Sequence, residues 1–80
     1  MNNFIYKIFG LGLGAIRNKR YIKINLMTLA GNRVRTIQFD ISDTATVSDI
    51  MTQLSARVVC DIDKITISDH VRFSDVGINS

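Results

Sequence analysis

The stretch from residue 21 to residue 58 constrains the fold most, because its hydrophobic period changes part-way along. Apolar and polar side chains alternate over residues 22–26 and again over 37–41, which is the period of strands with one buried face. After residue 46 the apolar side chains recur every three or four positions, as on one face of a helix. The stretch therefore predicts a β-hairpin followed directly by a helix.

The connection between the two strands has turn chemistry. Residues 30–33 read Ala-Gly-Asn-Arg, and both Gly31 and Asn32 can adopt a positive φ. The alternation after this turn is out of phase between Val34 and Ile37. We therefore expect a one-residue β-bulge near residues 35–36.

The helix has a recognisable start. Thr46 is followed three residues later by Asp49, a pattern that resembles a capping box. The apolar stripe behind it consists of Val47, Ile50, Leu54 and Val58. A helix this short needs the burial of that stripe against a sheet, because propensity alone does not hold it. A further strand is expected over residues 64–68.

Several short motifs occur along this region. They are Met-Thr-Leu-Ala-Gly at 27–31, Ser-Asp-Thr at 42–44, Thr-Val-x-x-Ile at 46–50 and Phe-Ser-Asp-Val-Gly-Ile at 73–78. In this order they resemble the first turn, the helix entry and a late loop of the ubiquitin-like family. The resemblance covers roughly residues 22–78 and implies a β-grasp.

The resemblance has two departures. The family's last strand, central in its sheet, has no counterpart after Ile78, and the C-terminal Gly-Gly used for conjugation is lacking. Of the family's interaction patch, Leu29 alone has a clear counterpart. We expect an α+β, ubiquitin-like β-grasp with one helix on a small mixed sheet, its last strand absent or replaced by the N-terminal segment or a partner.

The chain divides at residue 20 into an apolar and basic N-terminal segment, 1–20, and a ubiquitin-like domain, 21–80. The N-terminal segment has strand composition at its start, so it could complete the sheet of its own chain or of a neighbour. Completion of its own sheet would use residues 10–20 as a parallel crossover. The residues expected to complete the sheet are Phe4, Ile5, Tyr6, Ile8 and Phe9.

The N-terminal segment also fits other interpretations. Residues 4–20 could anchor the chain at an anionic membrane surface, or the chain could be a fragment whose continuation carries the last strand. The apolar run is too short for a transmembrane helix and lacks the layout of a secretory signal. The motif Gly10-x-Gly12-x-x-Ala15 is not followed by the helix, parallel strand and acid of a dinucleotide fold.

Charge is distributed unevenly along the chain. Residues 1–39 hold seven of the ten basic residues and no acid, while all seven acids are aspartates from Asp40 onward. Such asymmetry suits nucleic acid, anionic lipid or contact between copies. The candidate basic surface consists of Arg17, Lys19, Arg20, Lys23, Arg33 and Arg35.

The sequence offers no enzymatic site. Cys60 is the single cysteine and is expected to be a buried hydrophobe, and His70 is the single histidine, expected in a turn. No catalytic residue, metal site or cofactor is predicted.

We therefore expect a non-enzymatic protein–protein interaction module, a structural component of a larger assembly such as a viral particle (virion), secretion machine or ribonucleoprotein. Its partner would be protein, by self-association as an oligomer or within a larger complex. The alternatives are a membrane-surface adaptor anchored by residues 4–20 or a basic protein that contacts nucleic acid. A cytoplasmic, intracellular or viral location, not a secreted one, is expected.

Overall fold

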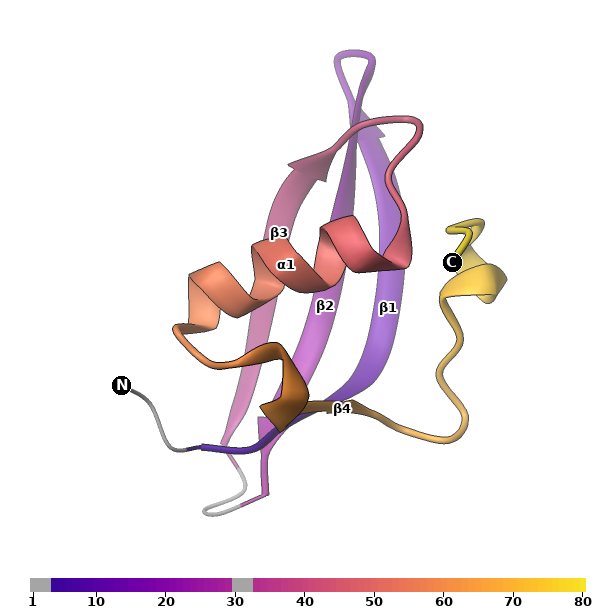
Figure 1. Cartoon of the computed structure of the whole chain (residues 1–80). Coiled ribbons are helices and arrows are strands. Elements are labelled where there is room, and N and C mark those ends of the chain that lie inside the picture. Colours follow the sequence, from indigo (N-terminus) through magenta and orange to yellow (C-terminus); the bar gives the residue numbers. More distant parts are fainter. Residues whose placement is uncertain (1–3, 30–32) are drawn as a thin grey trace.

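The computed structural model describes residues 4–29 and 33–80, which form an α+β arrangement of a four-stranded mixed sheet and an α-helix across one of its faces (Figure 1). The strands lie in the order β3-β2-β1-β4. In chain order the elements are β1 (Tyr6–Ile16), β2 (Lys19–Thr28), β3 (Val34–Ile41), α1 (Val47–Val58), the 3₁₀ helix η1 (Ile62–Lys64), β4 (Ile65–Ile67) and the 3₁₀ helix η2 (Phe73–Val76).

Strands β1 and β2 form an antiparallel hairpin with a two-residue turn. Arg17 and Asn18 occupy the turn, with φ of 53° and 66°. Positive φ at both central residues is the requirement of a type I′ turn, whose twist matches that of the flanking strands. The expectation that residues 10–20 form a parallel crossover is wrong, because a tight turn joins only antiparallel neighbours.

Strand β1 lies between β2 and β4 within its own chain. It is antiparallel to β2 and parallel to β4, with Tyr6 opposite Ile65 and Ile8 opposite Ile67. The strand begins at Tyr6 and extends to Ile16, well beyond the residues 4–9 that we expected to pair. The mixed sheet follows directly from this placement.

The predicted hairpin of β2 and β3 is present, but the predicted bulge is not. The register from Arg20 opposite Ile41 to Met27 opposite Val34 has no shift, so the expectation of a bulge near residues 35–36 is wrong. Arg35 takes a helix-side position opposite Leu26, which keeps the strand in phase although its side chain is exposed. The register shift lies in β1, between Ile8 and Gly10. The expected turn at residues 30–32 lies outside the described residues.

The helix begins as the sequence predicted. The Thr46 hydroxyl accepts a hydrogen bond from the Asp49 N–H, and the Asp49 carboxylate accepts one from the Thr46 N–H. This reciprocal pair is a capping box that satisfies two otherwise unpaired donors. On the predicted stripe Ile50, Leu54 and Val58 are buried and Val47 is half-buried. Met51 is also buried, which the stripe did not include.

The core lies between α1 and one face of the sheet. The fully buried side chains come from β1, β2 and α1. Cys60 joins the core as expected, 4% exposed and without a disulfide. The core residues are Tyr6, Ile8, Ile22, Ile24, Leu26, Phe39, Ile41, Ile50, Met51, Leu54, Val58, Cys60, Ile65, Phe73 and Ile78.

The segment after β4 folds back toward the helix start. His70 lies in a turn closed by the Val71 N–H and the Ser68 carbonyl at 3.0 Å, as predicted. Beyond η2, Asn79 forms an isolated parallel bridge with Thr46. In Figure 1 this segment runs alongside β1, with η2 beyond the strand's edge.

Candidate functional site

The edge of β1 that faces away from β2 has two unlike parts. Over residues 6–8 this edge pairs with β4, and the last bond is from the Ser68 N–H to the Ile8 carbonyl at 2.9 Å. Over residues 10–16 no described residue pairs with this edge, although the other edge remains bonded to β2 throughout. We call residues 10–16 the open edge. Unpaired donors and acceptors in an extended strand form a template for another strand.

The open edge carries no charged or proline residue of the kind that often protects edge strands, although η2 contacts β1 beside it. Lysines, prolines and short length usually block strand addition. Here seven successive residues, Gly-Leu-Gly-Leu-Gly-Ala-Ile, carry no charge and no proline. Ile16 at their end is 58% exposed. The strand is therefore chemically suited to pair with a second strand.

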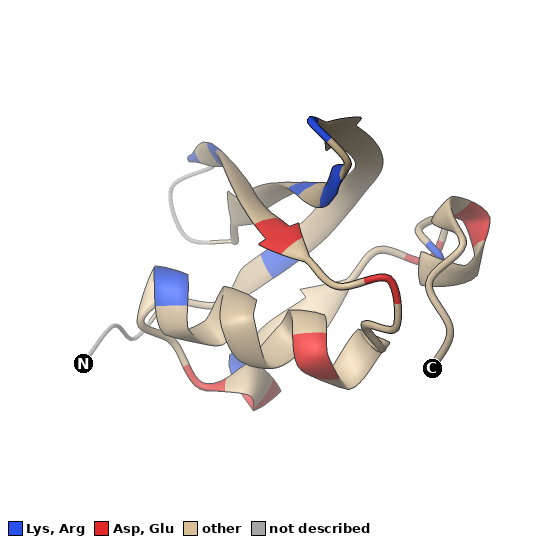
Figure 2. Ribbon diagram, turned by 90° about the horizontal axis from the view of Figure 1, so that it is seen from above, with Lys and Arg blue, Asp and Glu red and all other residues tan. Residues whose placement is uncertain are grey.

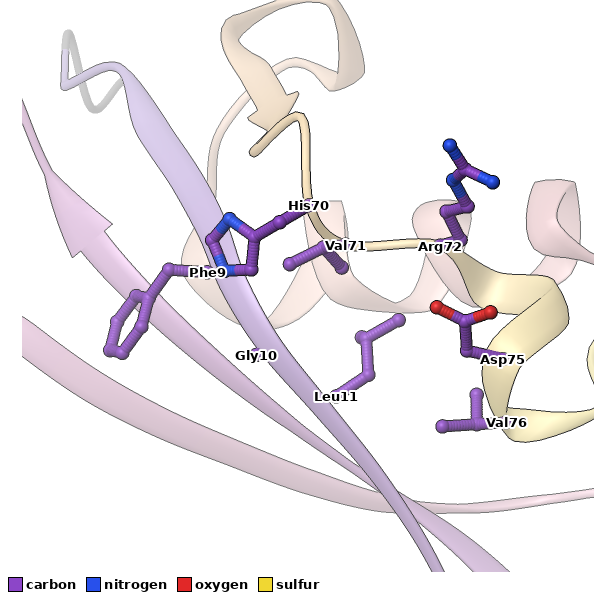
Figure 3. Close-up of a pocket in the computed structure, with 8 residues that line it drawn as sticks. All are labelled: Phe9, Gly10, Leu11, His70, Val71, Arg72, Asp75 and Val76. Atoms are coloured by element: carbon purple, nitrogen blue, oxygen red, sulfur yellow. The ribbon is translucent and has the colours of Figure 1, made fainter.

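A shallow groove of about 200 Å³ lies beside the start of the open edge. Figure 3 shows Leu11 pointing from β1 toward the chain segment that carries Val71 and Asp75, while Phe9 projects on the other side of the strand. The groove therefore lies along the edge of β1, between the strand and residues 70–76. Its lining residues are Phe9, Gly10, Leu11, His70, Val71, Arg72, Asp75 and Val76.

The helix-free side of β1 carries three glycines in a row. Gly10, Gly12 and Gly14 lie opposite Asn25, Lys23 and Tyr21 of β2. A Cβ at position 14 would lie 2.2 Å from the Tyr21 Cζ and hydroxyl oxygen, so the tyrosine covers this glycine. A Cβ at position 12 would meet nothing within 4 Å. The pairing of an aromatic ring with a cross-strand glycine is a known way to stabilise glycine in a sheet.

The residues expected to complete the sheet fall into two groups. Tyr6 and Ile8 are buried in the core, and Phe9 is half-buried at the register shift. Phe4 and Ile5 precede the strand and are each 45% exposed. The structure therefore places Tyr6 and Ile8 between β2 and β4 of the same chain.

The six candidate basic residues do not share one surface. Arg17, Lys19 and Arg20 lie at the β1–β2 turn, and Arg33 and Arg35 lie at the opposite end of the sheet. Arg20 and Arg35 take helix-side positions, whereas Lys19 and Lys23 take helix-free ones. Figure 2 shows basic residues mainly along the first three strands and their turns, and acidic residues along the helix and the loops.

Leu29, which the resemblance predicted to lie in an interaction patch, is exposed. Its side chain is 54% accessible, and its N–H donates to the Ile5 carbonyl at 3.1 Å. It therefore lies beside the start of β1, at the opposite end of that strand from the β1–β2 turn.

Cys60 lies beside Phe4. Its thiol donates to the Phe4 carbonyl at 3.3 Å. Burial raises the pKa of the Cys60 thiol, an effect opposed by Lys64 and reinforced by Asp61 and Asp63. A buried thiol with a raised pKa is a poor nucleophile. His70 is exposed.

Within residues 4–29 and 33–80 no three His, Cys, Asp or Glu side chains are grouped to hold a metal ion. In the same residues no helix has both the length and the apolar character needed to cross a membrane. The chain matches no protein-family model, no curated protein and no solved structure.

The open edge was missed by sequence reasoning, although a signal for it was present. Gly and Leu alternate from Gly10 to Gly14 with the period of a strand, and Asn18 is typical of a type I′ turn. Residues 10–20 were predicted as a crossover because strand use was assigned to residues 4–9 alone.

Proposed function

We propose that this chain is a non-enzymatic protein–protein assembly module whose copies associate by antiparallel pairing of their open edges. The observation that carries the proposal is the uncharged edge of β1 over residues 10–16, unpaired on one side. Strand addition would satisfy its backbone donors and acceptors and join two sheets into one.

The open edge is complementary to itself. If Leu13 lies opposite Leu13 of the second copy, then Gly10 lies opposite Ile16 and Gly12 opposite Gly14. The exposed Ile16 side chain would then pack over a position without a side chain. Such pairing of a large residue with a glycine supports close contact across the joint.

The groove supports the same pairing. On the helix side, Leu11 would lie opposite Ala15 of the second copy, so apolar side chains of the incoming strand would extend the surface formed by Leu11, Val71 and Val76. The pairing is isologous, since each copy uses the same residues, and it closes at a dimer.

We also propose that the fold is a ubiquitin-like β-grasp in which β1 occupies the position of the family's last strand. The order of hairpin β2–β3, capped helix α1 and strand β4 supports this relationship. Strand β1 lies in the expected slot between β2 and β4, although it is antiparallel to β2.

The test of assembly introduces a positive charge at Leu13 in one variant and a negative charge at the same position in another. Multi-angle light scattering of the full chain across concentration should show a dimer. Leu13→Lys and Leu13→Glu should each be monomeric, because each places like charges opposite one another across the joint. An equimolar mixture of the two variants should restore the dimer with one copy of each.

Ala56→Lys is the matched control for Leu13→Lys. It adds the same positive charge on the exposed face of α1 and should leave the dimer intact. Circular dichroism melts should show that both Leu13 variants remain folded. A wild-type chain that stays monomeric at every concentration would contradict the proposal. So would folded single variants whose mixture does not dimerise.

A further inference from the structure

The helix-free face of the sheet has a composition unlike that of the rest of the molecule. Along β2 the side chains that alternate with the buried ones are Tyr21, Lys23, Asn25 and Met27. Beside them β1 contributes Lys7, the glycines opposite β2 and, at its end, the exposed Ile16. The face on these two strands is therefore shallow over β1 and lined by polar, basic and aromatic side chains along β2.

Charge on this face is predominantly positive. Lys7, Lys19 and Lys23 take helix-free positions. Among the described residues of the strands, Asp40 at the end of β3 is the acid on the same face. The other six aspartates lie in the helix, the loops and the C-terminal segment, as Figure 2 shows for the ribbon. A polyanion is the ligand complementary to such a face.

Aromatic and basic side chains alternate along the middle strand. Lys19, Tyr21 and Lys23 point to the same side at steps of about 7 Å, because side chains on one face of a strand recur every second residue. Tyr21 is half-buried and lies over Gly14, so β1 contributes no side chain directly opposite the ring. On the same face Ile16 lies opposite Lys19, and Asp40 of β3 lies opposite Tyr21. Phe9, also half-buried, lies farther along the same side of β1.

We propose that the helix-free face binds single-stranded nucleic acid along β2, with phosphates contacting Lys19, Lys23 and Lys7 and a base stacking on Tyr21. Proteins that bind single strands without sequence preference combine a basic surface with aromatic stacking positions. A duplex presents no unstacked base, so a single strand fits this face better. The assembly proposed above uses the edge of β1 and reaches this face only through Ile16, so the residues proposed to bind nucleic acid differ from those that pair the strands.

The test is fluorescence anisotropy with a labelled oligonucleotide of about 12 nucleotides, a length within the usual site size. Three lysine–phosphate contacts predict a slope of log affinity against log salt of about −2, and Lys23→Gln should reduce it by about 0.7. Tyr21→Leu should weaken binding about tenfold while keeping an apolar cover over Gly14. The duplex of the same sequence should bind more weakly than the single strand.

The matched control is Lys64→Gln, which makes the same change in net charge at the helix side of the molecule. It should leave both affinity and salt slope unchanged. Equal loss in Lys23→Gln and Lys64→Gln would show attraction to net charge alone and overturn the proposal. If the chain floats with anionic vesicles but does not bind the oligonucleotide, the face binds lipid and the nucleic-acid proposal is overturned.

Discussion

Both halves of β1 pair with β2 along one edge, but only the first half pairs with a strand along the other edge. Residues 6–8 lie between β2 and β4, and their alternate side chains are buried in the core. Residues 10–16 pair with β2 alone, and five of the seven are only half-buried. The comparison teaches that a strand position is buried by what lies beside and beneath it, not by its own composition, because the leucines lie in the less buried half.

The register shift at Phe9 separates the two halves. The extra residue falls between Ile8 and Gly10, where pairing with β4 ends. A bulge bends the strand and increases its twist. Past this point the chain after β4 leaves the sheet through the turn at His70, so β1 continues without a second paired strand.

Hydrogen exchange should show the largest difference between the halves. At a concentration where the chain is monomeric, amides of residues 6–8 directed at β4 should exchange only on global unfolding. Amides of residues 10–16 directed away from β2 should exchange about a thousandfold faster, since they have no bond to break. Nuclear magnetic resonance resolves each amide. Equal protection in the two halves of the monomer would contradict the absence of a hydrogen-bonded partner along residues 10–16.

Core truncation should separate the halves by free energy. Ile8→Ala should lower the free energy of unfolding by about 3 kcal/mol, because the Ile8 side chain is completely buried. Leu13→Ala should cost about 1 kcal/mol, since Leu13 only flanks the core. Urea denaturation of both variants measures the difference. A larger loss for Leu13→Ala would show that the open half carries the stability.

Two alanine substitutions within the open half should have opposite effects. Gly14→Ala should destabilise by about 1 kcal/mol, because its Cβ would displace the Tyr21 ring. Gly12→Ala should stabilise by about 0.5 kcal/mol, since nothing lies near the new methyl group and the unfolded chain loses entropy. Thermal melts of the pair provide the measurement. Identical melting temperatures would mean that the tyrosine does not cover Gly14.

The smallest effect concerns the thiol beneath the first half. The pKa of Cys60 is raised by burial, so iodoacetamide labelling of the folded chain should rise with pH at a higher midpoint than in urea. As pH rises, the thiol ionises in the unfolded chain before it ionises in the folded one. The free energy of unfolding should therefore fall between the unfolded-state and folded-state pKa of Cys60. Cys60→Ala should abolish this alkaline decline. A folded-state midpoint at or below the unfolded one would contradict the burial.

Much of the second half of the chain could be predicted from local pattern. The capping box at Thr46, most of the helix stripe, the buried Cys60 and the turn at His70 each depend on neighbours within a few residues. The bulge predicted near residues 35–36 is absent because the charged Arg35 occupies a helix-side position, where the pattern called for an apolar residue. The position lies at the sheet's edge, so the Arg35 charge can reach solvent. The open edge and the groove depend on segments about sixty residues apart.

The sequence by itself determined the hairpin of β2 and β3, the start of α1 and the segregation of charge, because hydrophobic period and capping chemistry act locally. Tertiary structure alone decided which strand lies beside β4, where β1 loses its second neighbour and which face the lysines share. Those outcomes follow from competition among long-range pairings for one buried slot. Tyr6 and Ile8 occupy that slot because a two-residue turn returns β2 directly beside them.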